Sequence, residues 1–326
     1  MTKVAVVILN YNGRKYLETF LPSVIQYTEN YEIIVADNAS TDDSVFFLKN
    51  NFSSIKILQN TDNQGFASGY NTALKQVSAK YYILLNSDVE VTPNWIKPII
   101  DLMDSDKSIA ACQPKIRSFN EKTHFEYAGA AGGYIDWLGY PFCRGRVFDA
   151  YEEDLGQYND TKEIFWATGA CMFVRASVFH EMGGFDANFF AHMEEIDLCW
   201  RMKKAGNKIF YCSDSTVFHV GGGTLHKSNP RKTFLNYRNG LAMLYKNLPS
   251  NKLFFTILLR LILDGISGIK LLLGGSFSDF IAIIKAHFAF YAMIPKLERK
   301  SPKEVSLIYQ KSIVWEYFAK KQMPKL

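Results

Sequence analysis

The sequence predicts an α/β fold, an open and mostly parallel sheet flanked by helices, followed by a helical, amphipathic C-terminal appendage. Two observations predict this arrangement. In the first hundred residues, short apolar runs rich in β-branched residues alternate with stretches of helical periodicity. Beyond about residue 230, long apolar segments that carry scattered charges replace this alternation. A chain of 326 residues has room for one large domain and such an appendage.

Four short apolar runs in the N-terminal part are expected to be strands. Each is closed by Asn, Asp or Ser, and each is apolar on both faces, as in parallel sheets that are buried on both sides. The expected strands are Val4–Leu9, Ile33–Ala36, Ile55–Leu58 and Tyr81–Leu85.

Helices are expected between these strands. The first covers Lys15–Tyr27 and is bent or shortened by Pro22, the second opens in STDDSVFFL with Ser40 or Thr41 as its cap, and the third runs from about Ala67 to Val77. Ligands of such sheets bind at the carboxyl ends of the strands. The polar groups NYNG, DNAS and NSD that end the strands are therefore the expected binding region.

The following segment is less regular. From about 113 to 160 the sequence is aromatic and glycine-rich, and FWATGACMFVRASVFHEMGGF then predicts a buried strand, a short helix and a turn at Gly183–Gly184. Glu195–Lys204 is expected to be helical and to end at Gly206. IFYCSDSTVFHVGGGT reads as a strand that ends in glycines.

Two apolar segments, Leu253–Leu273 and Phe277–Ile294, dominate the C-terminal region. Both contain charged residues that are costly inside a bilayer, and Arg260 and Asp264 are spaced to pair on one helical face. An amphipathic hairpin that lies on a membrane surface or packs on a partner fits best. A membrane span and ordinary core helices are the alternatives.

Composition excludes some classes of protein. The net charge of +5 is too small to indicate nucleic acid binding, but basic residues gather late, in NPRKTFLNYR, IPKLERKSPK and AKKQMPKL, which suits an anionic membrane surface. The five cysteines are scattered and form no CxxC, so buried thiols in a reducing compartment are expected. The N-terminus resembles a signal peptide only superficially, and we expect a cytoplasmic protein, peripheral on the inner face of the cell membrane. An exposed apolar C-terminal face would also suit a homodimer.

Two groups of polar residues suggest a site for a metal and an anion. Asn86, Ser87 and Asp88 end the fourth strand, where a carboxylate beside an amide suits Mg²⁺ or Mn²⁺, although ordinary turn chemistry explains the same residues. His219 follows an apolar strand and is either a structural group or a ligand. DNQGFASGYN (62–71) is a polar helix entry suited to an anion, but no Walker or GxGxxG sequence is present.

A cluster of acids, Glu194, Glu195 and Asp197, lies in HMEEIDLCWR. Such crowded carboxylates repel one another unless water or a cation shares the site. One interpretation is a catalytic base with its neighbours, and the alternative is a charged helix N-terminus that faces water.

The order of these blocks resembles that of the family 2 glycosyltransferases, which have the GT-A fold. The blocks are VVILNYNG, IIVADNASTDDS, NQGFASGYN, LLNSDVEV, GACMFVR, MEEIDLCWR and VFHVGGG, and the resemblance covers roughly residues 3–225. It is closest to the rhamnosyl- and galactofuranosyl-transferase-like branch. It implies a GT-A domain at 1–228, with a Rossmann-like nucleotide-sugar half at 1–112 and an acceptor half at 113–228, before a helical region at 229–326.

The resemblance also implies roles for individual residues. Asp88 would bind the metal on the diphosphate and His219 would complete that site. Gly169 and Ala170, in GACMFVR, would line the acceptor side. The residues implied to hold the nucleotide-sugar are Asn10, Tyr11, Asn12, Asp37, Asn63, Gly65, Asn71, Asn86, Ser87 and Asp88.

Two departures from the family pattern concern the catalytic residues. Asn86 stands where a DxD motif has its first carboxylate, and Glu195 stands where the resemblance expects an Asp base. We expect Glu195 to be the base, Glu194 to orient hydroxyls, and Asp197 to hold structure by pairing with Arg201.

The predicted function is that of an inverting glycosyltransferase. It would move a sugar from a UDP- or dTDP-sugar, with Mg²⁺ or Mn²⁺, to a glycan or lipid-linked saccharide in cell-surface polysaccharide assembly. The alternatives are a sugar-1-phosphate nucleotidyltransferase, which NYNG does not favour, and a non-catalytic assembly partner that binds nucleotide-sugar.

Overall fold

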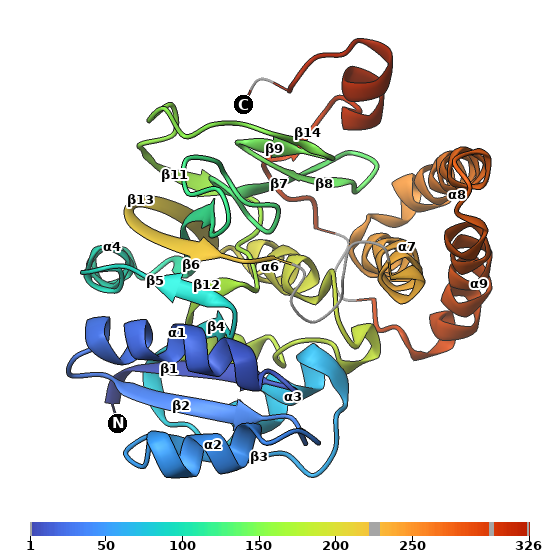
Figure 1. The fold of residues 1–326 in the computed structure, drawn as a ribbon. Coiled ribbons are helices and arrows are strands. Elements are labelled where there is room, and N and C mark those ends of the chain that lie inside the picture. Colours follow the sequence, from blue (N-terminus) through green and yellow to red (C-terminus); the bar gives the residue numbers. More distant parts are fainter. Residues whose placement is uncertain (1, 222–228, 300–302, 325) are drawn as a thin grey trace.

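The structure is a computed structural model that describes residues 2–221, 229–299, 303–324 and 326. Gly222 and Gly223, which belong to the predicted glycine-rich strand end, lie outside the described residues. In the described residues a nine-stranded sheet has the order β11-β13-β6-β12-β4-β1-β2-β3, with β5 paired to β13 (Figure 1). Its strands are β1 (Thr2–Asn10), β2 (Glu32–Asp37), β3 (Lys56–Gln59), β4 (Ala79–Asn86), β5 (Val89–Val91), β6 (Ile109–Ser118), β11 (Thr161–Ile164), β12 (Cys171–Arg175) and β13 (Lys208–His219).

The N-terminal half of this sheet is parallel, as the sequence predicts. β1 pairs in parallel with both β2 and β4, which brings Asn10 beside Asp37 and Leu9 beside Asn86. The four predicted strands are confirmed, and side chains alternate between two hydrophobic clusters, with Val4 and Val6 in one and Ala5 and Val7 in the other. β12 is antiparallel to both of its neighbours, so the complete sheet is mixed.

Helices cover both faces of the sheet. The cluster on one face includes side chains of α1 (Arg14–Tyr27), α2 (Ser44–Asn51) and α4 (Lys97–Ser105). The other cluster includes side chains of α3 (Gly65–Leu74), α5 (Ala176–Glu181) and α6 (Glu194–Lys204). Pro22 lies inside α1, as predicted. Both glycines of the predicted Gly183–Gly184 turn have positive φ. Gly206, with a φ of +90°, follows the end of α6, also as predicted. All five cysteines are buried and free, as predicted.

The predicted cap of α2 is wrong. The residue before the helix is Asp43, not Ser40 or Thr41. The Ser40 hydroxyl instead accepts hydrogen bonds from the backbone N–H of Asn12, at 2.9 Å, and from the side chain of Asn10, at 3.1 Å. Ser40 therefore ties the loop after β2 to the loop after β1, and its side chain is not available to the helix.

The irregular segment folds into a second sheet that the sequence pattern did not predict. The described residues give it the order β10-β9-β8-β7-β14. Four strands come from the glycine-rich segment and the fifth comes from the C-terminal region, which is therefore not wholly helical. The strands are β7 (Gly133–Asp136), β8 (Pro141–Cys143), β9 (Arg146–Val147), β10 (Ala150–Tyr151) and β14 (Ile308–Tyr309).

Three long helices lie together at one side of the molecule (Figure 1). They are α7 (Pro230–Asn247), α8 (Ser250–Leu273) and α9 (Phe277–Met293), which confirms two helices where the two apolar segments were expected. The predicted Arg260–Asp264 pair is present at 3.5 Å and is buried. Within the described residues, one helical segment, Phe277–Lys296, is long and apolar enough to cross a membrane, and 28% of its most apolar window is buried.

Candidate active site

A cavity of about 720 Å³ opens at the carboxyl ends of the parallel strands, where the sequence predicts the ligand to bind. It is lined by residues from both sheets, from α6 and from α7. Asp88 and Glu195, which were predicted from separate blocks, share it. The predicted site residues on its wall are Tyr11, Asn63, Gly65, Asn86, Ser87, Asp88, Gly169, Ala170, Glu194, Glu195 and His219.

Several other predicted site residues do not line the cavity. Asn10, Asn12 and Asp37 form a hydrogen-bonded support, in which the Asn10 amide donates to Asp37 Oδ1 at 3.0 Å. The other oxygen of Asp37 accepts from the backbone N–H of Ser40 at 3.0 Å, and Asn12 Oδ1 accepts from the N–H of Thr41 at 2.7 Å. These contacts fix the shape of the loops that end β1 and β2.

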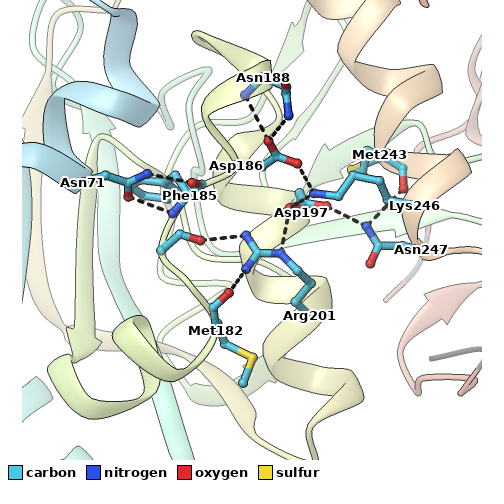
Figure 2. Close-up of polar contacts among 11 residues, drawn as sticks. Asn71, Met182, Phe185, Asp186, Asn188, Asp197, Arg201, Met243, Lys246 and Asn247 are labelled. Atoms are coloured by element: carbon cyan, nitrogen blue, oxygen red, sulfur yellow. Dashed lines mark hydrogen bonds and ion pairs between the residues drawn. The ribbon is translucent and has the colours of Figure 1, made fainter. Parts of the chain in front are cut away.

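Asn71 connects two segments that are distant in the sequence. Its amide nitrogen donates to the carbonyl of Phe185 at 2.7 Å, and its amide oxygen accepts from the N–H of the same residue at 3.0 Å (Figure 2). Both hydrogen-bonding groups of the side chain are used in this way. Asn71 therefore joins α3 to the turn that follows α5.

Asp88 and His219 lie side by side, as expected for a shared metal site. His219 Nε2 is 3.2 Å from Asp88 Oδ1, and its Nδ1 is 2.9 Å from Glu126 Oε2. All three side chains are buried. A carboxylate behind a metal-binding histidine fixes the orientation of its ring. Glu126 was not predicted, because it lies in the irregular segment and has no motif around it.

The donor set of Asp88 and His219 fits a divalent cation. A carboxylate oxygen and an imidazole nitrogen are suitable ligands for Mn²⁺, and a bound diphosphate supplies further oxygen ligands. Among the described residues, no group of three His, Cys, Asp or Glu side chains is arranged to hold a metal by itself. The residues present therefore suit a metal that the substrate helps to bind.

Glu194 and Glu195 begin α6 and face the cavity. The Oε2 atom of each is buried and has no hydrogen-bond partner in the described part of the chain. Burial raises the pKa of Glu195 to about 7. Burial, together with the repulsion from Glu195, raises the pKa of Glu194 well above its ordinary value. This pair can accept a proton near neutral pH, and the water-facing alternative does not fit its burial.

Asp197 turns away from the cavity into a buried polar network (Figure 2). One of its oxygens accepts from Arg201 at 2.8 Å and from Lys246 at 2.9 Å, and the other accepts from Asn247 at 2.8 Å. Although burial opposes ionisation, Arg201 and Lys246 hold the pKa of Asp197 below its ordinary value. The predicted pairing with Arg201 is confirmed, and Asp197 supports α6 from behind the acid pair.

The loop before α6 is held in an unusual conformation. Phe190, His192 and Met193 have φ values of +65°, +70° and +72°, which cost energy in residues other than glycine. The buried amide of Asn239, on α7, donates to the carbonyls of residues 189, 191 and 192 at 2.7–2.9 Å. α7 thus fixes the segment that leads into Glu194, a role that sequence periodicity did not reveal.

The fold and this site together define a glycosyltransferase of the GT-A type. Residues 5–183, more than half of the chain, match the family model described as glycosyl transferase family 2. The chain belongs to glycosyltransferase family 2.

Curated relatives agree with this assignment. The chain is 28% identical over 233 residues to the N-acetylglucosaminyl-diphospho-decaprenol L-rhamnosyltransferase of Mycobacterium tuberculosis, covering 66% of this chain and 75% of that protein. It is 26% identical over 226 residues to the rhamnosyltransferase WbbL of Escherichia coli K12, covering 66% of this chain and 83% of that protein.

Solved structures support the fold. The mannosyltransferase PcManGT of Pyrobaculum calidifontis, in complex with GDP-Man and Mn²⁺, aligns over 89% of this chain and 87% of that chain with a TM-score of 0.53 and 13% identity. GalNAc-T7 with UDP, GalNAc and Mn²⁺ aligns over 67% of this chain and 43% of that chain with a TM-score of 0.54 and 20% identity. Both neighbours contain Mn²⁺ with their nucleotide ligands.

Proposed function

We propose that this chain is an inverting glycosyltransferase that moves a sugar from a UDP- or dTDP-sugar to a lipid-linked saccharide during cell-surface polysaccharide assembly. One observation carries the proposal. Glu194 and Glu195 each have a carboxylate oxygen without a hydrogen-bond partner among the described residues, and both side chains line the same cavity as the Asp88–His219 pair. A donor diphosphate and an acceptor hydroxyl can therefore approach one sugar carbon from two sides.

The proposed chemistry is a single displacement. Glu195 removes the proton from the acceptor hydroxyl while the new C–O bond forms at the anomeric carbon and the bond to the diphosphate breaks. The configuration at that carbon inverts as a result. Asp88 and His219 would hold Mg²⁺ or Mn²⁺, which supplies a Lewis acid for the departing diphosphate when bound. Glu195 is suited to act as the general base near neutral pH because its pKa is about 7.

The other residues position the reactants. Glu194, whose pKa is raised by burial and by repulsion from Glu195, is placed to hydrogen-bond substrate hydroxyls. Tyr11, Asn63 and Gly65 line the donor side of the cavity, and Gly169 and Ala170 line the side that we assign to the acceptor. The second sheet closes the cavity around the acceptor and limits the access of water.

The C-terminal hairpin is the proposed contact with the inner face of the membrane. Exposed apolar side chains form a helical stripe on α8 and continue on α9: Phe254, Phe255, Leu258, Ile262, Ile266, Ile269, Leu272, Phe277, Ile284, Phe288 and Tyr291. The exposed charged residues on the two helices, Lys252, Lys270 and Lys285, are all positive, and Lys252 is paired with Glu304 at 2.6 Å. An apolar stripe flanked by lysines suits an anionic bilayer surface, on which a lipid-linked acceptor is found.

Donor binding provides the test of this function. UDP- and dTDP-sugars are added one at a time, with and without Mn²⁺, and the melting temperature is measured. The right donor should raise it in the presence of Mn²⁺ by mass action, and Asp88→Asn should abolish most of that shift. If no nucleotide-sugar shifts the melting temperature of the parent protein, the proposed donor site is wrong.

A further inference from the structure

Three basic side chains line the active-site cavity and take no part in the chemistry proposed above. Arg146 lies on β9 in the second sheet, and Arg231 and Lys232 lie in the first turn of α7. The chain segments that carry them are more than eighty positions apart in the sequence. The fold therefore places these cations on one wall from two separate elements.

Arg146 is a buried cation without a carboxylate partner. Its side chain is only 6% exposed, its Nε donates to the carbonyl of Phe148 at 3.0 Å, and no acid among the described residues lies within 4.0 Å of its guanidinium. Two equally buried arginines show the usual arrangement. Arg144 makes two 2.8 Å contacts with Asp160, and Arg260 faces Asp264. A buried charge without a counterion is costly, which indicates that an anionic ligand completes the site.

Tyr127 brings Lys232 close to Arg146. The guanidinium carbon of Arg146 is 3.5 Å from the centre of the Tyr127 ring, and Nζ of Lys232 is 5.5 Å from the same centre. Arg231 packs over the ring of Phe190, at 4.8 Å from its centre. α7 is an 18-residue helix whose positive end lies at these residues, and it adds to the attraction for an anion.

We propose that Arg146, Arg231 and Lys232 bind the diphosphate of a lipid-linked sugar acceptor. This inference rests on the proposed function. Asp88 and His219 serve the diphosphate of the donor. The wall formed by Arg146, Arg231 and Lys232, here called the cationic wall, is therefore left for a second diphosphate. The Thr233 hydroxyl, in the same turn of α7 as Lys232, donates to Asp279 of α9 at 2.6 Å, so the start of α9 and its exposed Phe277 lie beside the wall. A lipid chain attached to that diphosphate would lead from the wall towards this end of the apolar stripe. The Mycobacterium relative is named for an acceptor of this chemistry, a sugar joined to a polyprenol by a diphosphate.

Decyl diphosphate, used below its critical micelle concentration, is the probe of this site. Its binding is measured by calorimetry on the full chain, with the donor site saturated by Mn²⁺ and whichever of UDP and dTDP binds, and decyl glucoside serves as the uncharged comparison. The parent should bind the diphosphate at least tenfold more tightly than the glucoside. Arg146→Gln and Lys232→Gln should each weaken diphosphate binding about tenfold or more, whereas Lys49→Gln, on the exposed face of α2, should not change it.

The outcomes separate this inference from the proposed function. If neither UDP nor dTDP binds the parent, the donor site itself is wrong. If one of these nucleotides binds but decyl diphosphate binds no better than decyl glucoside, the cationic wall does not recognise a diphosphate. If the two variants weaken binding of the nucleotide and leave decyl diphosphate unchanged, the wall serves the donor. If Arg146→Gln is destabilised and melts at a lower temperature than the parent, Lys232→Gln is used to decide the test. Lys232 is only partly buried, so we expect its replacement to leave the fold intact.

Discussion

Replacing Glu195 by Gln should stop sugar transfer and at the same time stabilise the protein at alkaline pH. The substitution keeps the shape of the side chain and removes its ability to accept a proton. Loss of a general base costs about 10²–10⁴-fold in rate. The acidic limb of the pH profile, which rises as the carboxylate ionises near pH 7, should vanish with it.

The effect on stability follows from the direction of the pKa shift. The pKa of Glu195 is raised from its ordinary 4.5 to about 7 in the folded protein. A group whose pKa rises on folding contributes stability below its unfolded pKa and loses that contribution as the pH rises through the folded pKa. Gln copies the neutral form at every pH. The gain in free energy of unfolding should therefore grow from under about 1 kcal/mol at pH 5 to at most about 3 kcal/mol at pH 8.5.

Urea unfolding at the two pH values and the initial rate of transfer measure both effects. Glu29→Gln, at an exposed position in the turn that follows α1, is the matched control and should change neither quantity. A variant that transfers sugar at the parental rate would show that Glu195 is not the base. A variant that is no more stable than the parent at pH 8.5 would show that burial does not hold this carboxyl in its protonated form.

Three further variants test other features. Asn239→Leu removes the donor of the Ala191 and His192 carbonyls in the loop before α6, whereas the Phe189 carbonyl keeps Arg238. We expect a loss of about 2–3 kcal/mol in urea unfolding and a fall in kcat with the donor KM unchanged. Gly65→Ala places a Cβ 2.4 Å from a backbone oxygen at a φ of +85°, and should cost at least about 1–2 kcal/mol in the same assay. Phe254→Ser combined with Phe288→Ser should weaken binding to anionic vesicles by roughly 100-fold in co-sedimentation, whereas Phe46→Ser, equally exposed on α2, should not.

Much of the site could be predicted because its parts end strands or begin helices. Runs of apolar residues place Asn10, Asp37 and Asp88 at one edge of a parallel sheet, whatever the rest of the chain does. The i, i+4 spacing likewise predicts the Asp197–Arg201 pair without knowledge of its surroundings. Local periodicity is sufficient for such features.

The remaining features depend on contacts between distant segments. Glu126 reaches His219 across 93 positions, and Asn239 reaches the loop before α6 across 47 to 50 positions. Neither residue has a neighbour in the sequence that signals its role, since a buried polar side chain is recognised only by the partner that it satisfies. β14 is two residues long, and its pairing with β7 depends on the completed second sheet.

The position of α7 bears on how enzymes of this kind can be recombined. Its first turn touches the substrate cavity, its middle holds the strained loop through Asn239, and its end reaches Asp197 through Lys246. A chimaera that exchanges everything after residue 228 for the corresponding part of a relative would thus replace one wall of the cavity as well as the α8–α9 hairpin. Exchanges intended to change only the hairpin should cross over after Asn247, where the buried contacts with α6 are complete.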